Sequence, residues 1–445
     1  MKDIGRKRRR LDPVLPQPDF HTMVQACLCG ARRQVSPLAI MAIVGLGFDL
    51  LRIARAFPGV ALSAAVEYVS GLVMAGRRAT AARTSRVLGA LSHDALTRLR
   101  ECERFSVPRL AVAFVRLVQS FGVQGWLCLD DTLIAHERAK KMKGVYWDYD
   151  HAFRRNVLGS RLLVLLWSDG FCRIPVGFAF WHKKGARRKY RSKNEIARTL
   201  LRWAIHKGLR PKYVAFDNWY ASKENMKVTV EELGLPFVTR LKKNTKLLWN
   251  GKRVRAGTIG RRLLAEARAY GRDGRRARAT QVFVGDLGAM TFVVVKDDLD
   301  GQGVGTRFLL DSTPRAGAAG VVERYRSRWT IEVFFEDLKQ HLSLASYQGR
   351  SAEGQTAHVA LAFAGLVVLD ALRKRARLTL GEAREQAIRL VFARTKGEKW
   401  ELVSLKPAPS KALDGMAKAK KIVAGALHKV CQLTLPQVVH ASKAA

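Results

Sequence analysis

Several common features are missing from this sequence of 445 residues, and each absence excludes a class of protein. Its six cysteines form no CxxC pair and lie among apolar residues, so reduced, buried thiols are predicted rather than a zinc knuckle. No GxxxxGK(S/T) motif is present, which removes the usual sign of a nucleotide cofactor. His136, His151 and His182 match no zinc-binding pattern. A zinc site is therefore not expected.

Long hydrophobic runs near the N-terminus are also lacking. The apolar run at residues 38–48 is too short to span a bilayer and is followed at once by charges, so we predict a core helix there. Pro13 and Pro16 interrupt the basic start of the chain before any apolar segment, and no secretion signal is evident. We therefore expect a cytoplasmic protein with no membrane partner.

Acidic residues are outnumbered, since 37 Asp and Glu stand against 79 Lys and Arg and give a formal charge of +42. This charge far exceeds what solubility requires and indicates a polyanionic partner. The basic residues are spread along the chain, with clusters at 6–10, 183–193 and 418–421, as expected for an extended contact with nucleic acid on the nucleoid. Trp181 and Tyr190 accompany the middle cluster, which favours a DNA-backbone contact there over a solvated loop.

The pattern of residues changes along the chain and predicts an α/β fold, a mixed sheet flanked by helices and interrupted by a β-rich insertion. Helical spacing of Ala and Leu dominates before residue 120, which predicts an N-terminal all-α domain. The predicted segments are a basic disordered arm (1–20), an N-terminal helical DNA-binding domain (21–120), the first part of an α/β core (121–234), a β-rich insertion (235–312), the second part of the core with a Glu-bearing helix (313–375) and a basic, helical or partly ordered C-terminal region (376–445).

Acidic residues follow two of the predicted strands. The apolar run 123–129 predicts a buried strand that ends in Asp130 and Asp131, and 212–216 predicts a second strand that ends in Asp217. Because a predicted helix separates the two strands, a parallel crossover is expected, which brings these acids to one edge of the sheet. The intervening elements are a predicted hairpin (161–167 and 171–181) and that helix (192–207).

A third acid, Glu332, lies on a predicted helix at 316–341. Carboxylates from two strand ends and one helix can converge on two Mg²⁺ ions roughly 3.5 to 4 Å apart, the arrangement that phosphodiester chemistry uses. Tyr325, Arg328 and Lys339 share one face of that helix with Glu332, within an arc of roughly 60°. A solvated face with stray ion pairs is the alternative, but the apolar neighbours make this helix too hydrophobic to lie freely in water.

These motifs resemble those of bacterial insertion-sequence transposases of the DDE type, which have a ribonuclease H-like core. The resemblance covers about residues 120 to 370 and is to the insertion-sequence-four type, with its Y-R-E-K signature. The residues that carry it are Tyr325, Arg328, Glu332 and Lys339 at the spacing of the signature, Asp130-Asp131-Thr132 in place of an Asp-x-Thr motif, and Asp217 in place of the Asp after the fourth core strand.

The resemblance implies a transposase whose catalytic residues are Asp130, Asp217 and Glu332. These three carboxylates would bind two Mg²⁺ or Mn²⁺ ions. The implied reaction is cleavage at the terminal inverted repeats of an insertion sequence, followed by transfer of the DNA 3′-hydroxyl to target DNA. Because two ends must be held together, a homodimer on double-stranded DNA is expected.

The resemblance also implies a set of DNA-binding residues on the helix. Arg328 would grip a phosphate through its planar fork and Lys339 as a point charge, while Tyr325 would add a hydrogen bond. Trp329 would support a distorted end nucleotide, with a core position as the equally weighted alternative.

Two positions within the motifs stay open. Asp131 adjoins Asp130 and would point to the opposite face if the strand continued, and Glu336 lies on roughly the same helical stripe as Glu332. Two other functions also stay open: a stand-alone ribonuclease H-like nuclease or resolvase, and a catalytically decayed transposase relic that only binds DNA.

Overall fold

The computed structural model describes residues between Tyr68 and Leu402, apart from scattered positions before Val107 and the gaps at 138, 140, 151–153, 185–189, 271–274, 298–303 and 395–399. The predicted arm at 1–20, the core helix at 38–48 and the basic cluster at 418–421 lie outside the described residues.

Five strands form the centre of the fold, in the spatial order β4 (Arg173–Trp181), β3 (Arg155–Ser168), β1 (Trp126–Ala135), β5 (Val214–Phe216) and β6 (Phe237–Arg240). The first three pair antiparallel, whereas β5 runs parallel to β1 and β6 runs parallel to β5. Helix α8 provides the predicted crossover between the antiparallel and the parallel strands. The predicted mixed sheet with a ribonuclease H-like arrangement is confirmed.

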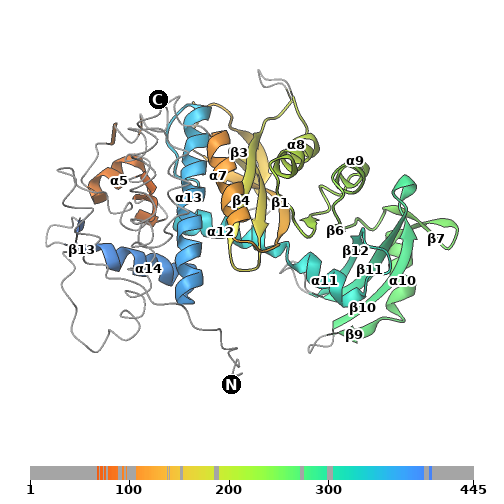
Figure 1. The fold of residues 1–445 in the computed structure, drawn as a ribbon. Coiled ribbons are helices and arrows are strands. Elements are labelled where there is room, and N and C mark those ends of the chain that lie inside the picture. The colour runs from red at the N-terminus through yellow and green to blue at the C-terminus, as the bar shows by residue number, and fades with distance from the viewer. Residues whose placement is uncertain are drawn as a thin grey trace, which may run out of the picture.

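Helices cover both faces of this sheet. Figure 1 shows α8 (Lys193–His206) on one side of β3 and β4, and α7 (Val107–Ser120) and α13 (Ala352–Ala376) on the other. α12 (Trp329–His341) packs against β1 and α13. β3 is buried over almost its whole length because it is covered from both sides, which explains why its sequence is a continuous apolar run rather than an alternating one.

α13 is the one helix of the described residues that is long and apolar enough to cross a membrane. Its most apolar window is 83% buried inside the protein, where Phe363 packs edge-on against Phe178 of β4. This helix is therefore part of the core.

Further strands extend the central sheet beyond β6. β12 pairs antiparallel with β6, and β11, β10, β7 and β8 follow in order. With β2 paired to β3 and β9 paired to β10, twelve strands form one sheet. β6 falls within the insertion predicted at 235–312, but in the structure it pairs parallel with β5 of the core. The division of the chain into domains stays a prediction. The elements not yet named are α5 (Ala81–Leu88), β2 (Tyr146–Asp150), α9 (Lys223–Lys227), the π-helix Val228–Glu232, β7 (Lys246–Trp249), β8 (Lys252–Arg255), α10 (Ala256–Leu264), β9 (Arg268–Tyr270), β10 (Arg275–Phe283), the 3₁₀ helix Gly285–Leu287, β11 (Ala289–Asp297), β12 (Gly305–Asp311), α11 (Ala318–Arg326), α14 (Leu380–Val391), β13 (Phe392–Arg394) and β14 (Trp400–Leu402).

The single helix predicted at 316–341 is wrong, because the structure has two helices there, α11 and α12. Between them the backbone N–H of Arg328 donates to the carbonyl of Tyr325 at 3.0 Å, and that of Ile331 donates to the carbonyl of Arg328 at 3.0 Å. These bonds span three residues instead of four, so the chain tightens into a 3₁₀ turn. Tyr325 therefore belongs to α11, and Arg328 is the N-cap residue of α12.

Two of the six cysteines lie within the described residues, and both are buried free thiols, as predicted for them. Burial raises the pKa of the Cys128 thiol to about 12, which makes it unreactive at neutral pH.

Candidate active site

The register of the parallel strands places two of the predicted carboxylates side by side. Leu129 of β1 pairs with Phe216 of β5, and Asp130 and Asp217 are the residues that follow each of them. The prediction that the first strand ends at its acids is wrong. β1 continues to Ala135, because β3 pairs with it over that whole length. Asp130 is thus held within a strand, while Asp217 begins a turn.

Arg328 connects the carboxylates. Its Nη1 atom donates to Oδ2 of Asp130 at 3.1 Å, and its Nη2 atom donates to Oε1 of Glu332, one helical turn further along α12. The Arg328 residue is only 5% exposed, and its cationic group lies 5.5 Å from the ring centre of Tyr325. Among the described residues, the Nε atom of Arg328 has no hydrogen-bond partner. Nη1 and Nη2, the two nitrogens of Arg328 that form hydrogen bonds, therefore both bond to carboxylates.

The electrostatics reflect this crowding of negative charge around one cation. Burial raises the pKa of Asp130 to about 7 against the lowering effect of the Arg328 charge, and the negative charges of Asp131 and Asp217 raise it further. Burial works against the charge of Arg328, but Tyr325 and the surrounding carboxylates hold its pKa above the ordinary value. Asp130, Asp217 and Arg328 thus form one coupled group.

Asp131 lies on the opposite face of β1, as its position next to Asp130 predicted for a continuing strand. Its Oδ2 atom accepts from Arg161 at 3.1 Å and from Lys193 at 3.0 Å, and its Oδ1 atom accepts from the hydroxyl of Tyr220 at 2.6 Å. The side chain of Asp131 is 8% exposed. The side chain of Asp131 therefore lies on the α8 side of the sheet, away from Arg328.

The two glutamates of α12 are separated in the same way. Glu332 bonds to Arg328, whereas Glu336 is exposed and its carboxylate accepts from Gln340 at 2.7 Å. Of these two, Glu332 alone contacts the group that contains Asp130.

The remaining residues of the motif lie close by. Lys339 donates from Nζ to the hydroxyl of Thr132 at 2.8 Å, two residues beyond Asp130 and on the same face of β1. The residue is exposed as a whole, but the loss of hydration at its ammonium group lowers its pKa. Trp329 is 41% exposed at the start of α12, so it is not a core residue, whereas Tyr325 is buried at 2% exposure beside Arg328.

The donor chemistry of Asp130, Asp217 and Glu332 fits hard divalent cations, which prefer carboxylate oxygens. In the described part of the chain, no group of three or more His, Cys, Asp or Glu side chains has the geometry to hold a metal ion. At this site the guanidinium of Arg328 bonds to two of the three carboxylates, Asp130 and Glu332.

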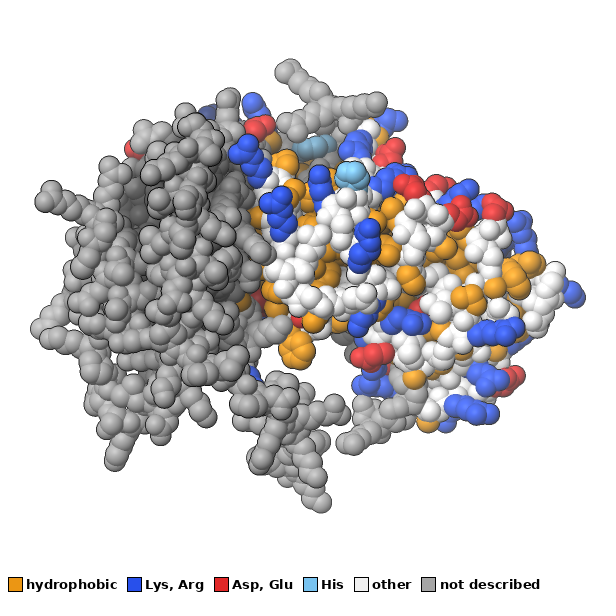
Figure 2. Space-filling model, in the orientation of Figure 1, with side chains coloured by type: hydrophobic (Ala, Val, Ile, Leu, Met, Phe, Trp, Pro, Cys, Tyr) orange, Lys and Arg blue, Asp and Glu red, His pale blue; other side chains and the backbone are white. Residues whose placement is uncertain are grey.

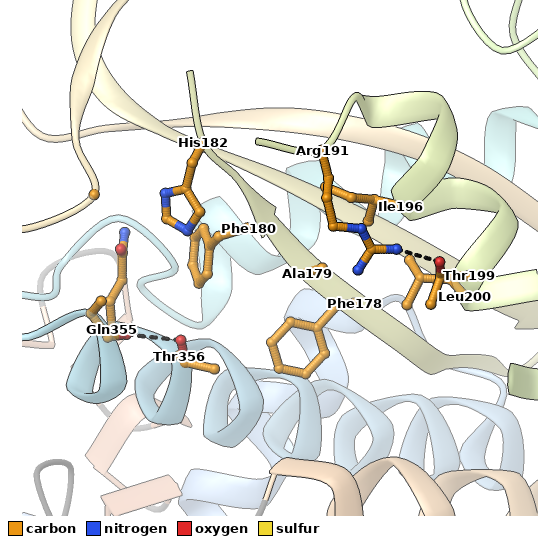
Figure 3. A pocket seen from close by; sticks show the side chains of 12 residues that line it. Phe178, Ala179, Phe180, His182, Arg191, Ile196, Thr199, Leu200, Gln355 and Thr356 are labelled. Atoms are coloured by element: carbon orange, nitrogen blue, oxygen red, sulfur yellow. Dashed lines mark hydrogen bonds between the residues drawn. The ribbon is translucent and has the colours of Figure 1, made fainter. Parts of the chain in front are cut away.

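A separate cavity of about 380 Å³ opens at the edge of β4, between α8 and the first turns of α13 (Figure 3). Its walls are mainly apolar, with Phe178 and Phe180 at the centre of the view. The Gln355 amide bonds to His136 and Ser160. This cavity contains none of the three predicted carboxylates, so we do not place the chemistry there.

Comparison with known families matches residues 56–283, just over half of the chain, to the DDE superfamily endonucleases. The chain belongs to the DDE superfamily of endonucleases. As a DDE endonuclease it acts on DNA, and enzymes of this superfamily generally use divalent metal ions. The matched range contains Asp130 and Asp217 but ends before Glu332. No curated protein matches the chain.

Two groups of supporting residues around the candidate active site escaped the sequence analysis. Tyr220 and Arg161 bond to Asp131 on the opposite face of β1 from Asp130, and the only signal for them was the doublet of acids itself. Arg173 is buried between Asp370 of α13 and Asp337 of α12. An acid within the apolar core of α13 was the available signal, because a buried charge requires a partner.

Proposed function

We propose that this DDE endonuclease is a transposase of the insertion-sequence-four type, which binds the terminal inverted repeats of its own element, cleaves at their ends and transfers the DNA 3′-hydroxyl to target DNA. The observation that carries the proposal is that Arg328 bonds to both Asp130 and Glu332, while the strand register places Asp217 beside Asp130. The spacing of the Y-R-E-K residues selects this transposase type within the superfamily.

Asp130, Asp217 and Glu332 would hold two Mg²⁺ or Mn²⁺ ions. Such ions supply a hydroxide or alkoxide nucleophile and stabilise the oxygen that leaves phosphorus. Arg328 would exchange its carboxylate partners for a DNA phosphate, because the two Nη atoms that now bond to Asp130 and Glu332 match two phosphate oxygens. Lys339, beside Thr132, would bind a second phosphate along β1.

The surface is suited to a long DNA contact. Figure 2 shows Lys and Arg side chains scattered over the whole described face, with Asp and Glu fewer. The formal charge of +42 is more than one short duplex segment requires, and two ends must be cleaved together. We therefore propose a homodimer on double-stranded DNA in the cytoplasm, associated with the nucleoid.

Cleavage of a labelled duplex that carries the end of the element tests the proposal. We expect nicking at the element boundary with Mg²⁺ or Mn²⁺, none with EDTA, and loss of nicking in Glu332→Ala. Glu336→Ala is the matched control, because this glutamate lies one turn away on the same helix but is exposed. Equal loss in both variants would contradict the site. Cleavage that ignores the element boundary would favour the stand-alone nuclease or resolvase, and binding without cleavage by the wild type would favour the decayed relic.

A change at Arg328 separates phosphate binding at the site from general affinity. Arg328→Ala is expected to reduce end cleavage by about 10²-fold or more, as for other removed donors that stabilise a transition state. Non-specific duplex affinity should change far less, because one phosphate contact among many is lost. The two are measured as a cleavage rate at saturating DNA and as a Kd for unrelated duplex. Equal proportional losses in both would make Arg328 a general backbone contact.

A further inference from the structure

The turn after β5 presents an exposed tryptophan beside the candidate active site. The backbone N–H of Tyr220 donates to the carbonyl of Asp217 at 3.0 Å and closes the turn. Trp219 is 58% exposed, whereas the neighbouring Tyr220 is fully buried with its hydroxyl bonded to Asp131. The buried residue thus anchors the turn and holds Trp219 toward solvent, two positions from Asp217.

Two lysines accompany this ring. The Nζ atom of Lys193 lies 5.1 Å from the ring centre of Trp219 and 5.5 Å from that of Trp181, so the lysine lies between two tryptophans. The Nζ atom of Lys242, an exposed residue just after β6, lies 5.9 Å from the ring of Trp219. Tyr146 packs edge-on against Trp181 with ring centres 5.3 Å apart. We call these five residues the aromatic-lysine row.

The row joins elements that are distant in sequence. Tyr146 belongs to β2, Trp181 ends β4, Lys193 begins α8, and the other two residues follow β5 and β6. Since β5 and β6 are parallel, their following loops lie at the same edge of the sheet, where the carboxylates converge. The row therefore lies at this edge of the sheet on the α8 side, which Asp131 faces, and Trp219 connects it to the candidate active site because it is two residues from Asp217.

The position of Lys193 at the start of α8 is unfavourable for the stability of the helix. A capping box between Ser192 and Glu195 begins α8 at Lys193, so the lysine occupies the first helical position. A cation there opposes the helix dipole by about 0.3–1 kcal/mol. The ion pair with Asp131 at 3.0 Å compensates for this. Lys193 is thus held between the rings by a carboxylate adjacent to Asp130.

We propose that the aromatic-lysine row binds single-stranded DNA beside the cleaved bond, with an unpaired base stacked on Trp219 and a flanking phosphate at the exposed Lys242, while Lys193, whose side chain is 14% exposed and paired with Asp131, supports the two tryptophan rings from below. One exposed tryptophan is ordinary on a protein surface. Aromatic rings alternating with cations along one groove are typical of sites for unpaired strands, because every base has a face that stacks and every nucleotide has a phosphate. A base within a duplex is already stacked, so it has no free face for the ring. The inference rests on the proposed cleavage of DNA at this edge.

Binding without metal tests this inference apart from catalysis. The full chain is titrated, in EDTA, against a labelled single strand and against its duplex, and a 2-aminopurine base in the strand reports stacking. Trp219→Ala is expected to weaken single-strand binding by about 5- to 100-fold, the range for removal of one stacking ring. Trp219→Phe should retain most of the affinity, and Lys242→Ala should reduce the salt slope by about 0.7. The control is Phe171→Ala, which removes an exposed ring at the turn between β3 and β4, at the other end of β1.

The outcomes separate the two proposals. Loss of single-strand affinity and of 2-aminopurine quenching in Trp219→Ala, with duplex affinity within about twofold of the wild type, supports the row. Unchanged single-strand binding, or an equal loss with duplex, overturns it. If the wild type binds single strands through Trp219 but does not cut element ends, the row stands and the proposed transposase activity fails.

Discussion

Replacing Asp217 by Asn is expected to reduce cleavage of element-end DNA by about 10³-fold or more, because bound metal ions contribute several kcal/mol to such reactions and each 1.36 kcal/mol is tenfold in rate. Duplex binding should be unchanged or stronger, since the substitution removes a negative charge near DNA phosphates. The shape of the side chain is conserved, so the turn closed by Tyr220 should remain. Single-turnover cleavage and duplex Kd values measure the two effects.

Asp286→Asn is the matched control for charge. Its carboxylate is exposed and pairs with Lys223 away from Arg328, so cleavage should stay within about twofold of the wild type. Cleavage by Asp217→Asn at the wild-type rate would contradict the assignment of this carboxylate. Loss of both cleavage and binding would point instead to a damaged fold.

The second large effect concerns stability. Arg173→Met is expected to lower the free energy of unfolding by about 3–5 kcal/mol, the usual result when one member of a buried ion pair is removed. The side chains of Arg173 and Asp370 are 3% and 2% exposed, and the arginine donates to both Asp370 oxygens at 2.8 and 2.7 Å. Its remaining Nη1 atom bonds to Asp337 of α12, so the variant also loosens the helix that carries Glu332.

Urea denaturation followed by circular dichroism measures this effect. Arg202→Met breaks a pair with Glu232 whose side chains are 46% and 47% exposed, and it should cost less than about 1 kcal/mol. Asp370 also pairs with Arg373 at 3.2 Å, but that arginine reaches only one of its two oxygens. The double variant Arg173→Met with Asp370→Leu should therefore recover part of the lost stability, because the under-compensated buried carboxylate is removed. If Arg173→Met and Arg202→Met are equally stable, the buried cluster contributes no more than a surface pair.

Much of the central fold could be predicted from residue patterns. The run before Asp130, the hairpin and the helix before Asp217 correspond to β1, the β3–β4 hairpin and α8, because apolar strands and capped helices carry local signals. The break between α11 and α12 has no such signal. Ser327 and Arg328 keep right-handed helical backbone angles, and neither Gly nor Pro marks the change in hydrogen bonding.

The sequence by itself determined the inventory of the site: its carboxylates, its basic partners, their spacing and the positive charge of the whole chain. Their catalytic and DNA-binding roles stay predictions. Only the tertiary structure decided which acids meet, placing Asp130 with Arg328 and Asp131 with Lys193, and separating Glu332 from Glu336. The physical reason is that Asp130 and Arg328 are 198 positions apart. Their contact depends on the register of β1 against β5 and on the packing of α12, which no local pattern encodes.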